Sequence, residues 1–138
     1  MNFNTPVAPI SWGELIDKIT ILEIKQIKIV NPTALVNIRK ELVYLNKIIL
    51  ENDGVEIAIK KIKASLFNVN MRLWQIEDDI RDKELKREFD NDFIELARMV
   101  YILNDERGSL KKTINTLLKS ELVEEKSYKN FQPSNLPE

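Results

Sequence analysis

Hydrophobic residues recur every three or four positions through most of the chain, a period that predicts amphipathic α-helices. Ser11 and Glu14 have the spacing of a capping box, so the first helix should begin there. Asn31-Pro32 reads as the end of this helix and the start of a second, and the turn residues Asn52-Asp53-Gly54 end the second. The predicted helices span about residues 11–30, 32–51, 55–87 and 91–119, with a C-terminal tail over 120–138.

The third and fourth helices carry the clearest pattern. Isoleucine, leucine and valine alternate at intervals of three and four from Ile59 to Ile80, and a second seam runs from Phe93 to Leu117. We therefore predict an all-α fold in a single domain, 1–138, an antiparallel bundle of four helices with coiled-coil spacing. At 1.5 Å per residue, the first two helices would be about 30 Å long and the last two about 40–45 Å. The long hairpin would project with part of its apolar seam uncovered, so we expect a homodimer.

Composition narrows the classes of function. Lys and Arg number 21 against 22 Asp and Glu, so no excess of positive charge favours nucleic acid. The chain has no Cys and no His, which excludes disulfides, thiolate and imidazole catalysis, and ordinary zinc ligation. We find no signal peptide and no apolar run long enough to cross a membrane, and expect a cytoplasmic protein.

The densest group of charges is the sequence RLWQIEDDIRDKE in the third helix. Its carboxylates have the chemistry to hold Mg²⁺, and Arg81 could then bind a phosphate. The interpretation we favour is interhelical ion pairing, since an antiparallel hairpin sets Arg81 near Glu95. The same register sets Arg98 near Asp78 or Asp79.

Arg107 interrupts the apolar seam of the fourth helix, opposite Asn70 and close to Trp74. Three explanations are open: Arg107 binds an anionic ligand, it is solvated, or it bonds a carboxylate of the first helix such as Asp17. Asn104, one turn earlier, could share either role. We expect Trp74 to be a core anchor rather than a stacking platform, although it also borders the candidate ligand site.

Two further groups of polar residues favour ordinary structural roles. In the first helix, Glu14 is assigned to the capping box, and Asp17 suits the positive end of the helix dipole. In the tail, charged residues could close over a pocket as a lid, but a solvated tail is the simpler interpretation. These tail residues are Glu124, Glu125, Lys126 and Tyr128.

Four sequence blocks resemble those of an uncharacterised family of short helical proteins: WGELIDKITILEIK, RLWQIEDDIR, FIELARMVY and LVEEKSY. The resemblance implies bacterial proteins, notably marine ones, and phage proteins, which sometimes occur beside or fused to sugar-handling proteins. It also implies that the polar residues of these blocks belong to motifs rather than to variable surface. By contrast, the all-α nucleotide pyrophosphohydrolases carry an EExxE block, which this chain lacks.

The leading hypothesis is a non-catalytic helical binding or interaction protein that takes an anionic or sugar-linked ligand or a protein partner, without a cofactor. The alternative is a Mg²⁺-dependent enzyme acting on a nucleotide or nucleotide-sugar phosphate, with metal held by Asp17, Glu77 and Asp78. The candidate ligand-binding residues are Trp74, Arg81, Arg98, Asn104 and Arg107.

Overall fold

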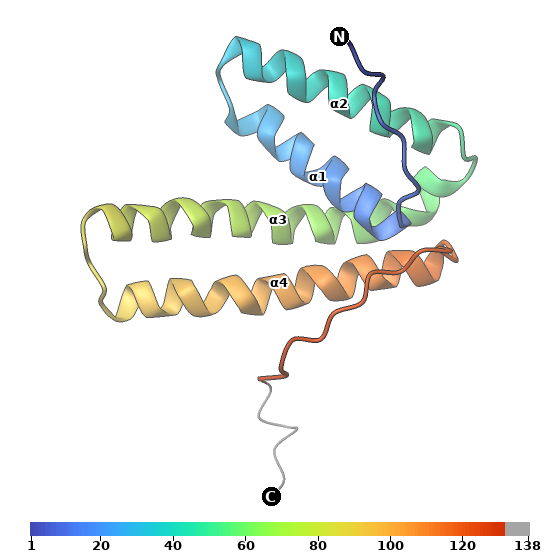
Figure 1. Ribbon diagram of the computed structural model, residues 1–138. Coiled ribbons are helices and arrows are strands. Elements are labelled where there is room, and N and C mark those ends of the chain that lie inside the picture. The colour runs from blue at the N-terminus through green and yellow to red at the C-terminus, as the bar shows by residue number, and fades with distance from the viewer. Residues whose placement is uncertain (132–138) are drawn as a thin grey trace, which may run out of the picture.

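The computed structural model describes residues 1–131 and confirms the all-α prediction. Within those residues the chain forms four helices and no strand (Figure 1). The bounds are α1 (Trp12–Lys28), α2 (Pro32–Leu50), α3 (Val55–Leu85) and α4 (Asn91–Leu117). Residues 132–138 of the predicted tail lie outside the described residues.

Three helices end two residues earlier than the hydrophobic pattern predicted. α1 stops at Lys28 because Ile29 is extended and leads into Asn31, whose side chain caps α2 by accepting from the Ala34 amide. α3 and α4 instead end in a tight turn at a residue with left-handed backbone, Arg87 (φ 53°) and Lys119 (φ 52°). Such turns usually contain glycine, so Arg87 and Lys119 carry no local signal that predicts them.

Both tight turns have the hydrogen bonds of a Schellman motif. At the end of α3 the Glu88 amide donates to the Lys83 carbonyl over 3.0 Å, and at the end of α4 the Ser120 amide donates to the Asn115 carbonyl over 2.8 Å. These bonds satisfy carbonyls that a helix end leaves without partners. The second turn also reverses the chain, so that residues 121–131 run back beside α4 (Figure 1).

The helices are arranged around the antiparallel pair α3 and α4, which pack on each other most extensively. α1 crosses the base of this pair and contacts both helices, and α2 packs on the outer side of α1 with few contacts to α3 (Figure 1). The main core lies where the four helices meet. Its most deeply buried apolar members are Leu15, Ile16, Ile19, Ile59, Leu66 and Ile114.

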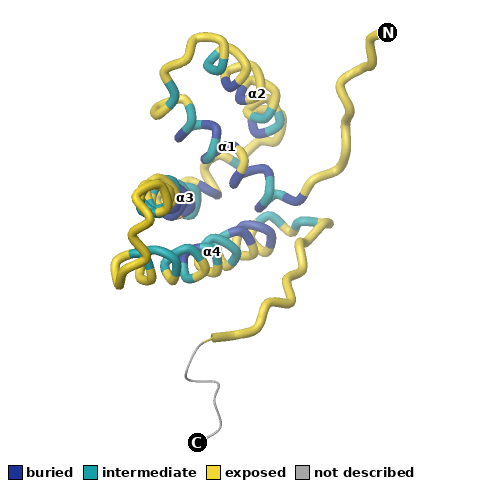
Figure 2. The backbone as a smooth tube through the Cα atoms, turned by 60° about the vertical axis from the view of Figure 1, so that its left-hand side comes forward, coloured by how far each residue is buried: buried dark blue, intermediate teal, exposed yellow. Residues whose placement is uncertain are grey.

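The long hairpin overhangs this core. Leu73 on α3 and Leu103 on α4 are buried, but no residue from 74 to 102 is (Figure 2). The seam residues of that stretch, such as Ile80 and Leu96, are only partly covered. We call residues 74–102 the overhang. No helix within residues 1–131 is long and apolar enough to cross a membrane.

Candidate functional site

The start of α1 is docked onto the end of α4 by side chains that satisfy its first amides. The Trp12 amide donates to Ser120 Oγ over 3.2 Å, and the Gly13 amide donates to Asn115 Oδ1 over 2.6 Å. The Glu14 amide donates to Ser11 Oγ over 3.2 Å, which confirms that half of the predicted capping box. Partners remote in sequence thus provide most of the capping that helix starts require.

Gly13 permits this close approach of the two helices. A Cβ atom at position 13 would overlap the backbone oxygen of Lys111 and lie 3.0 Å from Asn115 Oδ1. The first of these is backbone, which cannot rotate away as a side chain can. Any larger residue at position 13 must therefore push α1 away from α4.

One turn further along α1, Asp17 is fully buried and held on several sides. Arg107 donates from Nε to Oδ1 over 2.9 Å and from Nη2 to Oδ2 over 2.5 Å. Asn70 Nδ2 donates to the same Oδ1 over 2.9 Å and also to Thr20 Oγ1 over 2.9 Å. A buried carboxylate requires such partners, because its desolvation costs several kcal/mol.

The protonation state of Asp17 follows from the balance of these effects. Burial disfavours the charged carboxylate, but the hydrogen bonds from Arg107 and Asn70 and the positive charges of Arg107 and Lys111 outweigh it. The pKa of Asp17 therefore lies below its ordinary value. The hydrogen bond to Asp17 likewise raises the pKa of Arg107, so the pair is ionised at neutral pH.

Lys111 joins three parts of the chain. Its buried Nζ lies 2.7 Å from Glu14 Oε2 on α1, 2.9 Å from Glu124 Oε2 in the C-terminal segment, residues 121–131, and 3.9 Å from Asp17 Oδ2. Burial favours the neutral amine, but the two glutamates outweigh it and raise the pKa of Lys111. The same contact lowers the pKa of Glu124. Glu14 thus pairs with Lys111, and this ion pair replaces the second hydrogen bond of the capping box, in which the Ser11 amide would donate to the Glu14 carboxylate.

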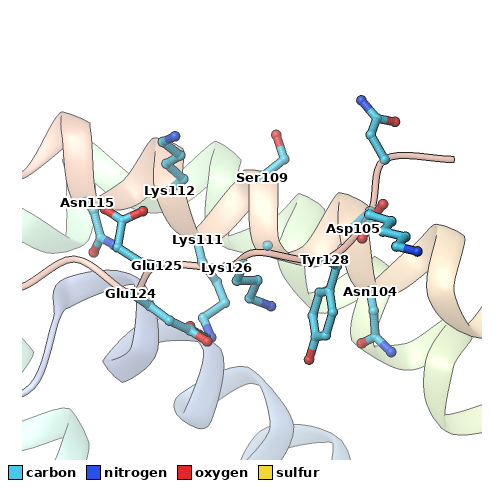
Figure 3. Close-up of a pocket in the computed structure, with 13 residues that line it drawn as sticks. Asn104, Asp105, Ser109, Lys111, Lys112, Asn115, Glu124, Glu125, Lys126 and Tyr128 are labelled. Carbon is cyan, nitrogen blue, oxygen red and sulfur yellow. Dashed lines mark hydrogen bonds and ion pairs between the residues drawn. The ribbon is translucent and has the colours of Figure 1, made fainter. Parts of the chain in front are cut away.

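Beside this junction of α1, α4 and the C-terminal segment around Lys111, α4 and the segment line an open groove of about 660 Å³ (Figure 3). Lys111 and Glu124 meet at one side of it, and Phe131 packs edge-on against Tyr101 farther along α4, with ring centroids 5.1 Å apart. The C-terminal segment therefore lies along α4. The groove is lined, among others, by Asn104, Asp105, Ser109 and Lys112 from α4 and by Glu125, Lys126, Tyr128 and Lys129 from the C-terminal segment.

The five candidate ligand-binding residues do not form one site. Asn104 lines the groove, and Arg107 is paired with Asp17, the last of the three explanations considered for it. Trp74 is half-buried on α3 at the start of the overhang. Arg81 and Arg98 are exposed on the overhang.

The predicted interhelical ion pairs of the overhang are wrong. Arg81 pairs with Glu77 over 3.5 Å and Arg98 with Glu95 over 3.1 Å, each within its own helix. An exposed arginine can pair with a carboxylate three or four residues away on its own helix, whereas a pair across the hairpin would fix a longer side chain. Pairing within each helix is therefore favoured over pairing between α3 and α4.

The alternative metal site is not assembled either. Asp17 is buried between α1, α3 and α4 with both oxygens bonded to Arg107, whereas Glu77 and Asp78 are exposed on the overhang. Among residues 1–131 no three carboxylates converge where they could hold a metal ion.

Sequence reasoning missed Lys111 and Asn115, which organise the junction. The signal was a polar stripe: Arg107, Lys111 and Asn115 follow one another at four-residue intervals, one face of a helix. Gly13 and Asp17 have the same spacing on α1. Matching the two stripes required the crossing of α1 over α4, which only the fold provides.

Comparison with known proteins places the chain in a family. The sequence model of the Family of unknown function (DUF6165) matches residues 7–137, nearly the whole length. The chain belongs to this family. The DUF6165 match contains all four sequence blocks described above and indicates no activity. Neither a curated protein nor a solved structure significantly matches the chain.

Proposed function

We propose that the chain is a non-catalytic binding protein whose groove between α4 and the C-terminal segment takes a small anionic sugar derivative, such as a sugar acid or sugar phosphate. The observation that carries this proposal is the groove's set of lysines. Lys112, Lys126 and Lys129 line it, and none of them forms an ion pair within 4.0 Å with another described residue. Lysine ammonium groups of this kind bind carboxylates and phosphates.

The other groove residues support a ligand that also carries hydroxyl groups. Asp105 and Glu125 offer acceptors, and Asn104, Ser109 and Tyr128 both donate and accept. A bare anion would gain from the lysines but would be repelled by the two carboxylates. A sugar that bears an acidic group satisfies both sets, because its hydroxyls donate to the carboxylates while its anion meets the lysines.

The buried charges nearby favour a structural role over catalysis. A catalytic carboxylate must reach substrate or metal, whereas both oxygens of Asp17 are bonded to Arg107. Lys111 is held by Glu14 and Glu124. Asp17, Glu77 and Asp78, the residues of the Mg²⁺-dependent alternative, are thus not brought together, whereas the groove offers accessible groups that can bind a ligand.

The test is titration with defined probes. Glucose 6-phosphate and glucuronate are added to ¹⁵N-labelled protein, with glucose and inorganic phosphate as comparisons, and amide shifts are followed by NMR. We expect the acidic sugars to shift amides of residues 104–112 and 124–130 and to bind more weakly as salt is raised. Glucose alone should bind more weakly because it lacks the anion.

Matched variants assign the site. Lys126→Ala with Lys129→Ala should weaken binding about tenfold, the scale of losing charge-assisted contacts. Lys60→Ala with Lys61→Ala removes two exposed lysines from α3, outside the groove, and should leave affinity unchanged. The proposal fails if neither acidic sugar binds at millimolar concentration, if inorganic phosphate binds equally well, or if the groove variants bind like the parent protein.

A further inference from the structure

The overhang has a face that continues the one covered by α1. On α4, Arg107 contacts Asp17 of α1, and Val100, Leu96 and Phe93 precede Arg107 on the same seam at intervals of seven, four and three residues. On α3, Asn70 contacts Asp17, and Glu77 follows it by one heptad. Beyond the end of α1 this face is half-buried apolar seam beside acidic residues, with no helix of the described chain over it.

A second exposed apolar face lies on α2, to one side of its buried residues Ile38, Leu42 and Ile49. Val36, Val43 and Leu50 are 62%, 70% and 73% exposed, and their spacing of seven puts them on one line. Lys40 and Lys47 keep the same interval beside that line. We call these five residues the α2 stripe. It is an apolar seam with a basic flank, the pattern of a helix that packs against another helix.

The two faces are complementary in charge. Residues 76–98 of the overhang contain nine Asp and Glu against five Lys and Arg, a net charge of −4. α2 contains three Lys and Arg against one Glu, a net charge of +2. Opposite net charges favour encounter of these surfaces and disfavour pairing of two overhangs with each other.

The two faces are also matched in length. The α2 stripe spans about 21 Å from Val36 to Leu50, at 1.5 Å per residue. The part of α3 within the overhang spans about 17 Å by the same measure, as does that of α4. One molecule carries both faces, so a second copy can use each of them once.

We propose that two copies of this chain form a two-fold dimer in which the α2 stripe of each protomer lies along the overhang of the other. A two-fold axis makes the contact reciprocal, so both apolar faces of both protomers are covered and no further copy can add. The dimer expected from the overhanging hairpin thereby gains a specific partner surface, α2. This proposal is independent of the ligand groove, whose residues lie on α4 and the C-terminal segment.

The first experiment measures molecular mass by light scattering and sedimentation velocity. We expect a dimer for the parent chain and a monomer for Val43→Asp, which places a charge in the middle of the α2 stripe. Ile57→Asp is the matched control, because Ile57 is an exposed apolar residue on α3 outside both faces. Circular dichroism shows that each variant remains folded. A monomeric parent chain at all concentrations, or a dimer that persists in Val43→Asp, overturns the proposal.

The second experiment exchanges charges across the interface. Lys40→Glu with Lys47→Glu should weaken the dimer, since each reversed residue then faces the acidic overhang. Adding Glu77→Lys and Glu84→Lys, which lie one and two heptads after Asn70, should restore the dimer by reversing the other side. Failure of this restoration, while all variants stay folded, shows that the two faces do not meet.

Discussion

The ion pair between Asp17 and Arg107 provides the sharpest test of how this bundle is held together. Asp17→Asn keeps the volume of the side chain and removes its charge, leaving Arg107 without its counter-ion. Removing one partner of a buried pair costs about 3–5 kcal/mol. The Asp17 side chain is 1% exposed but that of Arg107 is 30% exposed, so water can partly solvate the arginine. We therefore expect the lower end, about 3 kcal/mol.

This loss converts into a measurable change of melting temperature. An unfolding entropy of about 2.1 cal/mol/K per residue gives about 0.29 kcal/mol/K for this chain, so 3 kcal/mol lowers the melting temperature by about 10 °C. The unfolding free energy is measured by urea titration followed by circular dichroism. Arg107→Met should cost a similar amount because it leaves the carboxylate buried with fewer partners.

The double variant decides between a coupled pair and two independent effects. If the charges depend on each other, Asp17→Asn with Arg107→Met costs about 2 kcal/mol less than the sum of the single changes. The control cycle is Glu95→Gln with Arg98→Met, an exposed pair on the side of α4 away from its apolar seam, whose coupling should be at most about 0.5 kcal/mol. The reasoning would be refuted if the destabilisations of the two single variants simply add, or if the coupling free energy of Asp17 and Arg107 is no larger than that of the control pair.

Three further predictions are tested by the same denaturation assay. Gly13→Ala should destabilise the fold by about 1–3 kcal/mol, because the added Cβ meets the backbone of Lys111. Gly108→Ala should stabilise it by about 0.5–1 kcal/mol, because that Cβ meets only the flexible Lys126 side chain at 3.5 Å. Equal effects of the two substitutions would contradict the close approach of α1 and α4 at Gly13. The pKa of Asp17 is lowered in the folded state, so its contribution to the free energy of unfolding is complete above the unfolded pKa of about 3.9 and is lost as pH falls through the folded pKa. Asp17→Asn should therefore reduce the fall in stability with decreasing pH in that range. Lys119→Gly should stabilise the fold by about 0.5–1 kcal/mol, because glycine adopts the left-handed backbone conformation of this position without strain. A loss of stability would argue against the left-handed turn at the end of α4.

The helices and the hairpin could be predicted because their signals are local and repeated. The heptad pattern from Ile59 to Ile80 predicts a helix that packs along its apolar seam, and these residues lie within α3. Arg107 stood out because a charge in an apolar seam requires a partner, and Asp17 was among the partners considered. Local pattern and chemical necessity together were therefore enough to identify this pair.

The rest of the site depends on tertiary geometry that no local pattern encodes. Gly13 looks like an ordinary residue in the first turn of a helix until α4 is seen to cross it. Lys111 looks like one more surface lysine until Glu14 and Glu124 are brought to it from opposite ends of the chain. The interhelical pairs predicted for Arg81 and Arg98 were wrong because these side chains are exposed, and exposed side chains pair with neighbours on their own helix.

The docking of α1 onto α4 has a consequence for how the protein folds during synthesis. Gly13 and Asn115 are 102 residues apart in the chain, and Asp17 and Arg107 are 90 apart. A growing chain therefore carries the Asp17 carboxylate without its counter-ion until α4 has left the ribosome. Contacts so distant in sequence form late because loop closure must precede them. Nascent chains that stop before α4 should stay loosely packed, so the native packing of α1 can form only after α4 has emerged from the ribosome.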